Sequence, residues 1–167
     1  RDSNSYYATP SVADEHGFAL ADAPWPHIFD PFRNAVAGKK VAVIGHFPFA
    51  PKALNQAADF YMLERSLNEG DYPDSAAEYI LPECEYVFIT GSAFVNKTAP
   101  RLLELSRESF NVVLGPSTPL APVLLEEYGV SQVTGMVPTN PAGMFEGLEK
   151  GDSLDMFNFG HRVTLGR

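Results

Sequence analysis

An unbroken apolar run, Val41-Ala42-Val43-Ile44, constrains the fold of this chain more than any other stretch of its sequence. Two lysines precede the run and Gly45 ends it, so it has the length of a strand and is too short for a helix. A strand that is apolar at every position is typical of a parallel sheet covered on both faces. The run is therefore predicted to be the first strand of such a sheet.

Strand-like and amphipathic segments alternate after this run, which is the pattern of an open α/β sheet. Further strands are predicted at residues 60–63, 86–89, 112–115, 132–137 and 162–165. Helices are predicted at residues 31–37 and 52–58, from Ser75 with Glu78 completing a capping box, from Thr98 to Glu108, from Thr118 to Gly129, and from Asn140 to Lys150. This order predicts an α/β fold with a Rossmann-like, doubly wound, mainly parallel sheet.

The composition excludes several classes of function. A net charge of −9 with only 12 scattered basic residues argues against a nucleic-acid surface, which needs clustered lysine and arginine. No apolar run approaches the roughly 20 residues that span a bilayer, so no membrane partner is expected. Cys84 is the only cysteine and is expected to be buried, which fits a reducing, cytoplasmic location.

The residues that follow the predicted strands form the candidate site, because open parallel sheets bind ligands beyond the carboxyl ends of their strands. Glycines there allow close approach to the backbone, while polar side chains supply contacts. Two loops between elements add further carboxylates, a hydroxyl and an amide. The candidate ligand-binding residues are Gly45, His46, Phe47, Pro48, Glu64, Arg65, Asp71, Asp74, Ser75, Thr90, Gly91, Ser92, Asn96, Gly115, Pro116 and Ser117.

His46 is the candidate metal ligand or general acid–base group, since imidazole titrates near neutral pH. The alternative is a loop histidine that binds a backbone carbonyl. Asp71, Asp74 and Glu78 are candidate oxygen ligands, and the alternative for them is turn and cap chemistry. Both interpretations stay open for each group.

Two features bear on nucleotide binding: residues 45–49, the loop after the first predicted strand, and Glu64. The loop lacks the G-x-G-x-x-G fingerprint, and Pro48 removes a backbone donor, so a tightly held pyrophosphate is not expected. Glu64 lies 19 residues after Gly45, close to the spacing of an acid that binds ribose hydroxyls. S-adenosylmethionine is therefore a candidate cofactor, and the alternative is that Glu64 pairs with Arg65 or another neighbour.

Seven short motifs together resemble one family, the putative heavy-metal chelation family of Rossmann-like prokaryotic proteins. The motifs are Val43-Ile44-Gly45-His46-Phe47-Pro48, Leu63-Glu64-Arg65, Gly70-Asp71, Pro73-Asp74-Ser75-Ala76-Ala77-Glu78, Thr90-Gly91-Ser92-Ala93, Val95-Asn96 with Thr98, and Leu114-Gly115-Pro116-Ser117. The resemblance covers the chain from about Tyr6 to its end. It implies an enolase-N-terminal-like α/β domain ahead of the Rossmann-like domain, with the site in the cleft between them.

The resemblance divides the chain into a remnant or linker of the N-terminal domain, residues 1–37, and a Rossmann-like domain, residues 38–167. The first residue is Arg1, so the chain is expected to be a piece of a longer protein, with the missing segment or a partner chain supplying half of the cleft. Three functions stay open: binding of a transition metal, metal chelate or other small ligand; an enzyme such as an S-adenosylmethionine-dependent transferase; and a non-catalytic assembly domain in which Trp25 and Phe29 pack on a partner. A homo-oligomer is also open.

Overall fold

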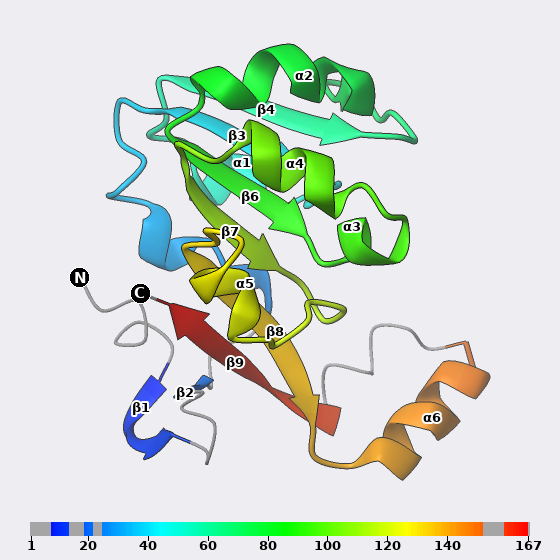
Figure 1. Cartoon of the computed structure of the whole chain (residues 1–167). Coiled ribbons are helices and arrows are strands. Elements are labelled where there is room, and N and C mark those ends of the chain that lie inside the picture. The colour runs from blue at the N-terminus through cyan, green and yellow to red at the C-terminus, as the bar shows by residue number, and fades with distance from the viewer. Residues whose placement is uncertain (1–7, 14–18, 22–24, 152–158, 167) are drawn as a thin grey trace.

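Strand β3 (Lys40–Ile44) lies inside a mixed sheet whose described strands follow the order β1-β2-β9-β8-β7-β6-β3-β4-β5 (Figure 1). The structure is a computed structural model that describes residues 8–13, 19–21, 25–151 and 159–166 of the chain. The strand predicted from the apolar run is confirmed, and its last four residues are all buried.

The sheet has a parallel part and an antiparallel part. The parallel strands are β3, β4 (Asp59–Glu64), β5 (Tyr72–Pro73), β6 (Tyr86–Thr90), β7 (Phe110–Leu114) and β8 (Gln132–Pro138). The antiparallel strands are β9 (Gly160–Gly166), β2 (Ala19–Ala21) and β1 (Ala8–Ala13). The predicted α/β fold with a mainly parallel sheet is therefore confirmed, and the strand predicted near residues 162–165 runs antiparallel to its neighbours.

Alternate side chains of β3 lie in two apolar cores, one on each face of the sheet. Ala42 and Ile44 belong to the core that α2 (Ala77–Ile80), η5 (Leu81–Glu83), α4 (Ala99–Leu105) and α5 (Val123–Glu126) cover. Val41 and Val43 belong to the other core, which α1 (Ala50–Ala53) and the 3-10 turns η2 (Trp25–His27) and η3 (Asp30–Phe32) cover. Burial of each of the larger side chains, those of the two valines and Ile44, stabilises the fold by about 1.5–3 kcal/mol. Helical layers thus lie on both faces of the sheet (Figure 1).

Aromatic side chains hold the segment before β3 against the sheet. The ring of Phe29 lies 5.2 Å from Phe88 of β6, 5.5 Å from Phe47 and 5.8 Å from Phe49, between ring centres. Phe29 is fully buried, and Trp25 packs partly buried against the same core. These aromatics thus pack on the sheet of this chain, while the division of the chain at residue 37 stays a prediction. Tyr6, at which the resemblance begins, lies outside the described residues.

Three predicted helices are shorter than the sequence pattern indicates. The segment 31–37 holds only the 3-10 turn η3 followed by turns. The helix predicted from Thr118 is wrong, since α5 starts at Val123. Pro119 and Pro122 explain the delay: each lacks a backbone donor and disfavours helical geometry in the residue before it. The predicted helix at 52–58 is likewise reduced to α1, which ends at Ala53.

The predicted capping box is also wrong. The residue that caps α2 is Ala76, after a 3-10 turn η4 (Asp74–Ala76), and neither N-cap makes a side-chain bond. Glu78 pairs with Arg101 instead, as described below. Thr98 does stand at the N-cap of α4, but its hydroxyl donates to Asn96 rather than accepting a helix N–H.

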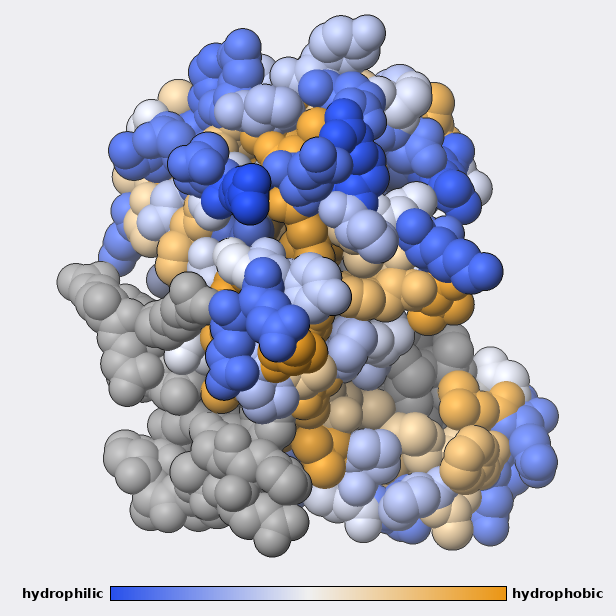
Figure 2. Space-filling model, in the orientation of Figure 1, coloured by the Kyte–Doolittle hydropathy of each residue, from blue (hydrophilic) through white to orange (hydrophobic). Residues whose placement is uncertain are grey.

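Helix α6 (Pro141–Glu149) projects beyond β8 and β9, and none of its residues is buried (Figure 1). Its predicted start is confirmed, because the Asn140 side chain accepts a hydrogen bond from the Gly143 amide at 3.1 Å. Hydrophobic and hydrophilic residues mix on its visible surface (Figure 2), and Phe145 is 65% exposed. No helix in the described part of the chain combines the length and the apolar character that crossing a membrane requires.

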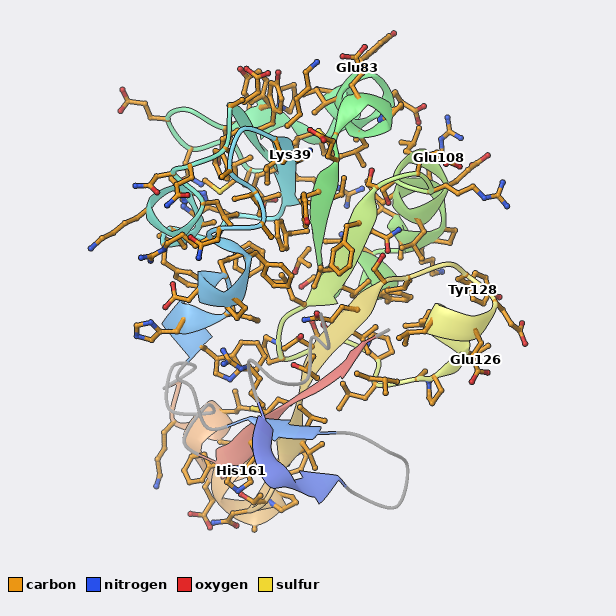
Figure 3. All side chains as sticks on the ribbon, turned by 90° about the vertical axis from the view of Figure 1, so that its left-hand side faces the viewer. Lys39, Glu83, Glu108, Glu126, Tyr128 and His161 are labelled. Atoms are coloured by element: carbon orange, nitrogen blue, oxygen red, sulfur yellow. The ribbon has the colours of Figure 1, made fainter. Side chains whose placement is uncertain are left out.

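The side of the sheet at which the parallel strands begin carries exposed ion pairs. Lys39 pairs with Glu85 at 2.6 Å, and Lys40 pairs with Glu83 at 3.0 Å. Figure 3 views this side and places Lys39 and Glu83 in the upper part of the molecule, with His161 at the lower end. Such exposed pairs each contribute only about 0–1 kcal/mol to the stability of the fold. The candidate site is therefore sought at the other ends of the strands, their carboxyl ends.

Substitution of Gly91 tests how tightly the chain packs at the end of β6. A Cβ atom at this position would lie 2.5 Å from the Thr118 backbone nitrogen and 2.7 Å from the Ser117 carbonyl carbon. We expect Gly91→Ala to lower the free energy of unfolding by about 1–3 kcal/mol, because backbone atoms must shift to make room. Urea denaturation measures the loss. Gly147→Ala in α6, where the nearest atom is a Phe159 ring carbon at 3.4 Å, is the matched control and should cost nothing; equal losses in both would contradict the account.

Candidate ligand-binding site

A cavity of about 560 Å³ opens at the carboxyl ends of β3, β4 and β6. The chain continues from β3 to β4 on one side and returns to β6 on the other side, so strand order reverses between β3 and β6. Loops diverge at such a reversal and leave a crevice, which is where open α/β sheets bind ligands. The volume lies in the range of small-molecule sites.

The cavity gathers many of the predicted site residues. Those that line it are Gly45, His46, Phe47, Glu64, Arg65, Asp74, Ser75, Thr90, Ser92 and Asn96. Glu78, a candidate oxygen ligand, lines it as well. Sequence reasoning did not include the other lining residues, Ile44, Leu63, Ala77, Ala93, Lys97, Thr98, Arg101, Leu102 and Leu105. That any of them contacts a ligand stays a prediction.

Gly45 allows β3 and β6 to meet at the floor of the cavity. Its φ is +104°, a conformation that side chains rarely adopt, and a Cβ there would lie 3.1 Å from the Thr90 side chain. The chain therefore leaves β3 directly into the loop that carries His46.

His46 is oriented by a buried carboxylate. Its Nδ1 lies 3.1 Å from Oδ2 of Asp71, whose side chain is inaccessible to solvent, while the imidazole is 34% exposed. The same Asp71 oxygen accepts hydrogen bonds from the backbone and side-chain nitrogens of Asn68 at 3.0 and 3.2 Å. His46 thus binds a carboxylate rather than the loop carbonyl of the alternative interpretation.

The charge state of Asp71 decides which nitrogen of His46 carries the proton. Burial by itself raises the pKa of Asp71, but the bonds from Asn68 and His46 outweigh it, so the pKa lies below its ordinary value. An ionised carboxylate only accepts hydrogen bonds, so Nδ1 of His46 must donate. The neutral ring then has its lone pair on Nε2, which accepts no hydrogen bond from a described residue. A histidine held in this way is suited to bind a metal or accept a proton.

Glu64 ends β4 beside this loop. Its two carboxylate oxygens accept backbone N–H bonds from His46 at 3.0 Å and from Arg65 at 2.6 Å. The Arg65 guanidinium pairs elsewhere, with Asp74 at 3.1 Å. The alternative in which Glu64 forms an ion pair with Arg65 is therefore not what the structure has, and the Glu64 charge has no cationic side-chain partner among the described residues.

Arg101 and Glu78 close part of the cavity from the helical layer. Arg101 of α4 donates to Glu78 of α2 at 2.8 Å through Nε and also to Glu104 at 2.7 Å. The hydrogen bond from Arg101 lowers the pKa of Glu78, and the two carboxylates raise the pKa of Arg101. These residues are 23 positions apart, so sequence patterns gave no signal for the pair.

Lys97 lies at the cavity between α3 (Ser92–Val95) and α4. Its φ is +66°, and it is the one residue other than glycine with a positive φ in the described ranges. Beside it, Oδ1 of Asn96 accepts hydrogen bonds from the amide and hydroxyl of Thr98 at 3.2 and 2.7 Å. This leaves the Asn96 side-chain nitrogen directed to no described acceptor.

The loop after β7 does not reach the cavity. Gly115, Pro116 and Ser117 are absent from its lining because the following residue, Thr118, packs directly over Gly91. Pro48 and Gly91 also lie outside the lining, and Asp71 acts only through His46.

Cys84 takes no part in the site. It is buried, its thiol donates to the Ile80 carbonyl at 3.3 Å, and burial raises its pKa to about 11. Among the residues that the structure describes, no three His, Cys, Asp or Glu side chains cluster as a metal site. A metal held here would need donors beyond those of this part of the chain.

A mainly parallel α/β sheet with a cavity at its strand-order reversal defines a Rossmann-like domain. The sequence profile of the putative heavy-metal chelation family matches residues 27–165, and the chain belongs to that family. The resemblance found in the sequence is confirmed.

Two solved structures of the same family share the fold. One, from Desulfitobacterium hafniense DCB-2, has unknown function and is 43% identical, with a TM-score of 0.80 over 98% of this chain and 64% of that chain. The other, from Pyrococcus horikoshii, also of unknown function, is 24% identical, with a TM-score of 0.72 over 78% of this chain and 55% of that chain. An uncharacterised protein of Methanocaldococcus jannaschii is 28% identical over 101 residues, 57% of this chain and 39% of that protein. This chain thus spans less than two thirds of each relative.

Asp71→Asn tests the carboxylate that holds His46. We expect the variant to lower the free energy of unfolding at neutral pH by about 1–2 kcal/mol, because bonds to an ionised acceptor are lost. Since the folded-state pKa lies below 3.8, this stabilisation is complete above that value and disappears as the pH falls through the folded-state pKa. Urea denaturation at several pH values should therefore show the two proteins converging in acid. Asp30→Asn, an exposed aspartate bonded to His27, is the control and should change little; a pH-independent loss in Asp71→Asn would contradict the assignment.

Proposed function

We propose that this domain binds a metal chelate in the cavity at the carboxyl ends of β3, β4 and β6, with Nε2 of His46 as the protein's ligand to the metal. The observation that carries the proposal is the hydrogen bond between Asp71 and Nδ1 of His46. A carboxylate behind a histidine fixes the ring and increases its basicity, as in many metal sites. The description of the family as one of putative heavy-metal chelation supports the same choice.

The donor set favours a chelate over a bare ion. Sites that hold zinc or similar ions use three or four protein ligands, whereas the described residues offer one unoccupied imidazole nitrogen and no three-donor cluster. A chelate brings its own donors and needs only one or two positions filled by the protein. The cavity volume of about 560 Å³ accommodates such a molecule.

The second candidate function is an S-adenosylmethionine-dependent transferase. The observation in its favour is Glu64, which stands at the end of the strand next to β3, where Rossmann-like enzymes place the acid that binds ribose hydroxyls. Each of its oxygens accepts one backbone bond and retains a lone pair for a ligand. Binding of a metal chelate needs no catalysis. The two candidate functions are therefore distinguished by which ligand, a metal chelate or S-adenosylmethionine, stabilises the protein.

Thermal unfolding of protein without an affinity tag tests the first proposal with Ni²⁺–nitrilotriacetate, a chelate that leaves coordination positions open for imidazole. We expect this chelate to raise the melting temperature, and a ligand at 100 times its Kd adds about 2.7 kcal/mol of stability. Free Ni²⁺ and S-adenosylmethionine are the comparison ligands. A shift with S-adenosylmethionine alone would support the transferase instead.

His46→Ala should abolish the shift that the chelate produces. His27→Ala is the matched control, because His27 also pairs through Nδ1 with an aspartate, Asp30, but lies outside the cavity. An equal chelate shift in wild type and His46→Ala would overturn the proposal, as would the absence of any shift in wild type.

A further inference from the structure

We propose that Lys97 binds an anionic group of the ligand, so that the cavity selects carboxylate-bearing chelates with negative charge over positively charged ones. This inference rests on the proposed function and names the class of chelate.

The first support is the pairing of charges around the cavity. Arg65 pairs with Asp74, and Arg101 pairs with Glu78 and Glu104. Lys97 is the one lining cation for which the described residues provide no carboxylate within ion-pair distance. The Lys97 ammonium group is therefore available to form a charge-assisted hydrogen bond with an anionic group of a ligand.

The second support is the backbone of Lys97. Its φ of +66° belongs to the left-handed region, which glycine and asparagine occupy far more readily than lysine. Neighbouring bonds hold this conformation, since the Thr98 amide donates to the Ala93 carbonyl at 2.9 Å and to Asn96 Oδ1 at 3.2 Å. This is the C-terminal turn of α3, in which the residue after the C-cap Asn96 is left-handed, and it fixes the point beside the cavity from which the Lys97 side chain leaves the backbone.

The third support is the distribution of polar groups across the cavity. Glu64, which lacks a cationic side-chain partner in the described part of the chain, and Nε2 of His46 come from the β3–β4 side. Lys97, the free amide nitrogen of Asn96 and the hydroxyl of Ser92 follow β6. A cationic metal facing the first group and a carboxylate facing the second would match both sides.

A pair of chelates with opposite charge tests this inference. Ni²⁺–nitrilotriacetate is an anion and Ni²⁺–tris(2-aminoethyl)amine is a cation, and both are tetradentate complexes that leave open coordination positions. Titration calorimetry on tag-free protein should show tighter binding of the anionic chelate to wild type. Lys97→Asn removes the charge and keeps a residue suited to positive φ, so it should weaken the anionic chelate about tenfold, a change of about 1.4 kcal/mol, and leave the cationic chelate unweakened.

Two further variants separate charge from side-chain loss. Lys97→Arg should retain the preference for the anionic chelate, because the cation is kept. Lys52→Asn removes an exposed lysine outside the cavity and should leave both affinities as in wild type.

The outcomes distinguish the two proposals. Binding of both chelates with equal affinity in wild type, or an unchanged preference in Lys97→Asn, would overturn the role of Lys97 and leave the proposed function standing. Binding of neither chelate would overturn the proposed function itself. A preference that disappears in Lys97→Asn and persists in Lys52→Asn supports the inference.

Discussion

The reversal of strand order between β3 and β6 determines where the other parts of this structure lie. These two parallel strands pair over residues 41–44 and 86–89, yet the chain leaves them in opposite directions, toward β4 and toward β7. Their loops must therefore separate, and Gly45 permits the separation to begin close to Thr90. The crevice that results receives polar groups from three strand ends, while exposed ion pairs lie at the opposite ends of the strands.

Hydrogen bonds and charges give this crevice its chemical character. Hydrogen bonds from Asn68 and His46 stabilise the ionised form of Asp71, and the ionised carboxylate keeps the proton of His46 on Nδ1. The Glu64 carboxylate is held by backbone amides, whereas Arg65 and Arg101 are neutralised by carboxylates. Among the described residues that line the cavity, one imidazole lone pair and one unpaired ammonium group remain, and the proposed function and its further inference rest on these two groups.

The sequence predicts the sheet well because its strands are buried on both faces and appear as continuous apolar runs. It overestimates the helices, since Pro119 and Pro122 interrupt a segment whose apolar spacing looks helical. For the site, strand ends were a good guide after β3, β4 and β6, but the loop after β7 packs on Gly91 and misses the cavity. The pairing of His46 with Asp71, 25 residues apart, and the isolation of Lys97 depend on loop conformation, which sequence periodicity does not encode.

The protonation of His46 is the most direct measure of the central claim, that Asp71 prepares Nε2 for a ligand. Long-range ¹H–¹⁵N correlation NMR of ¹⁵N-labelled protein above the pKa of the ring distinguishes the two neutral tautomers, with His46→Ala providing the assignment. The account predicts a proton on Nδ1 and an unprotonated Nε2 in the free protein, and the reverse or a mixture in Asp71→Asn. A wild-type ring protonated on Nε2 would contradict it, because no lone pair would then be available at the nitrogen that Asp71 leaves free.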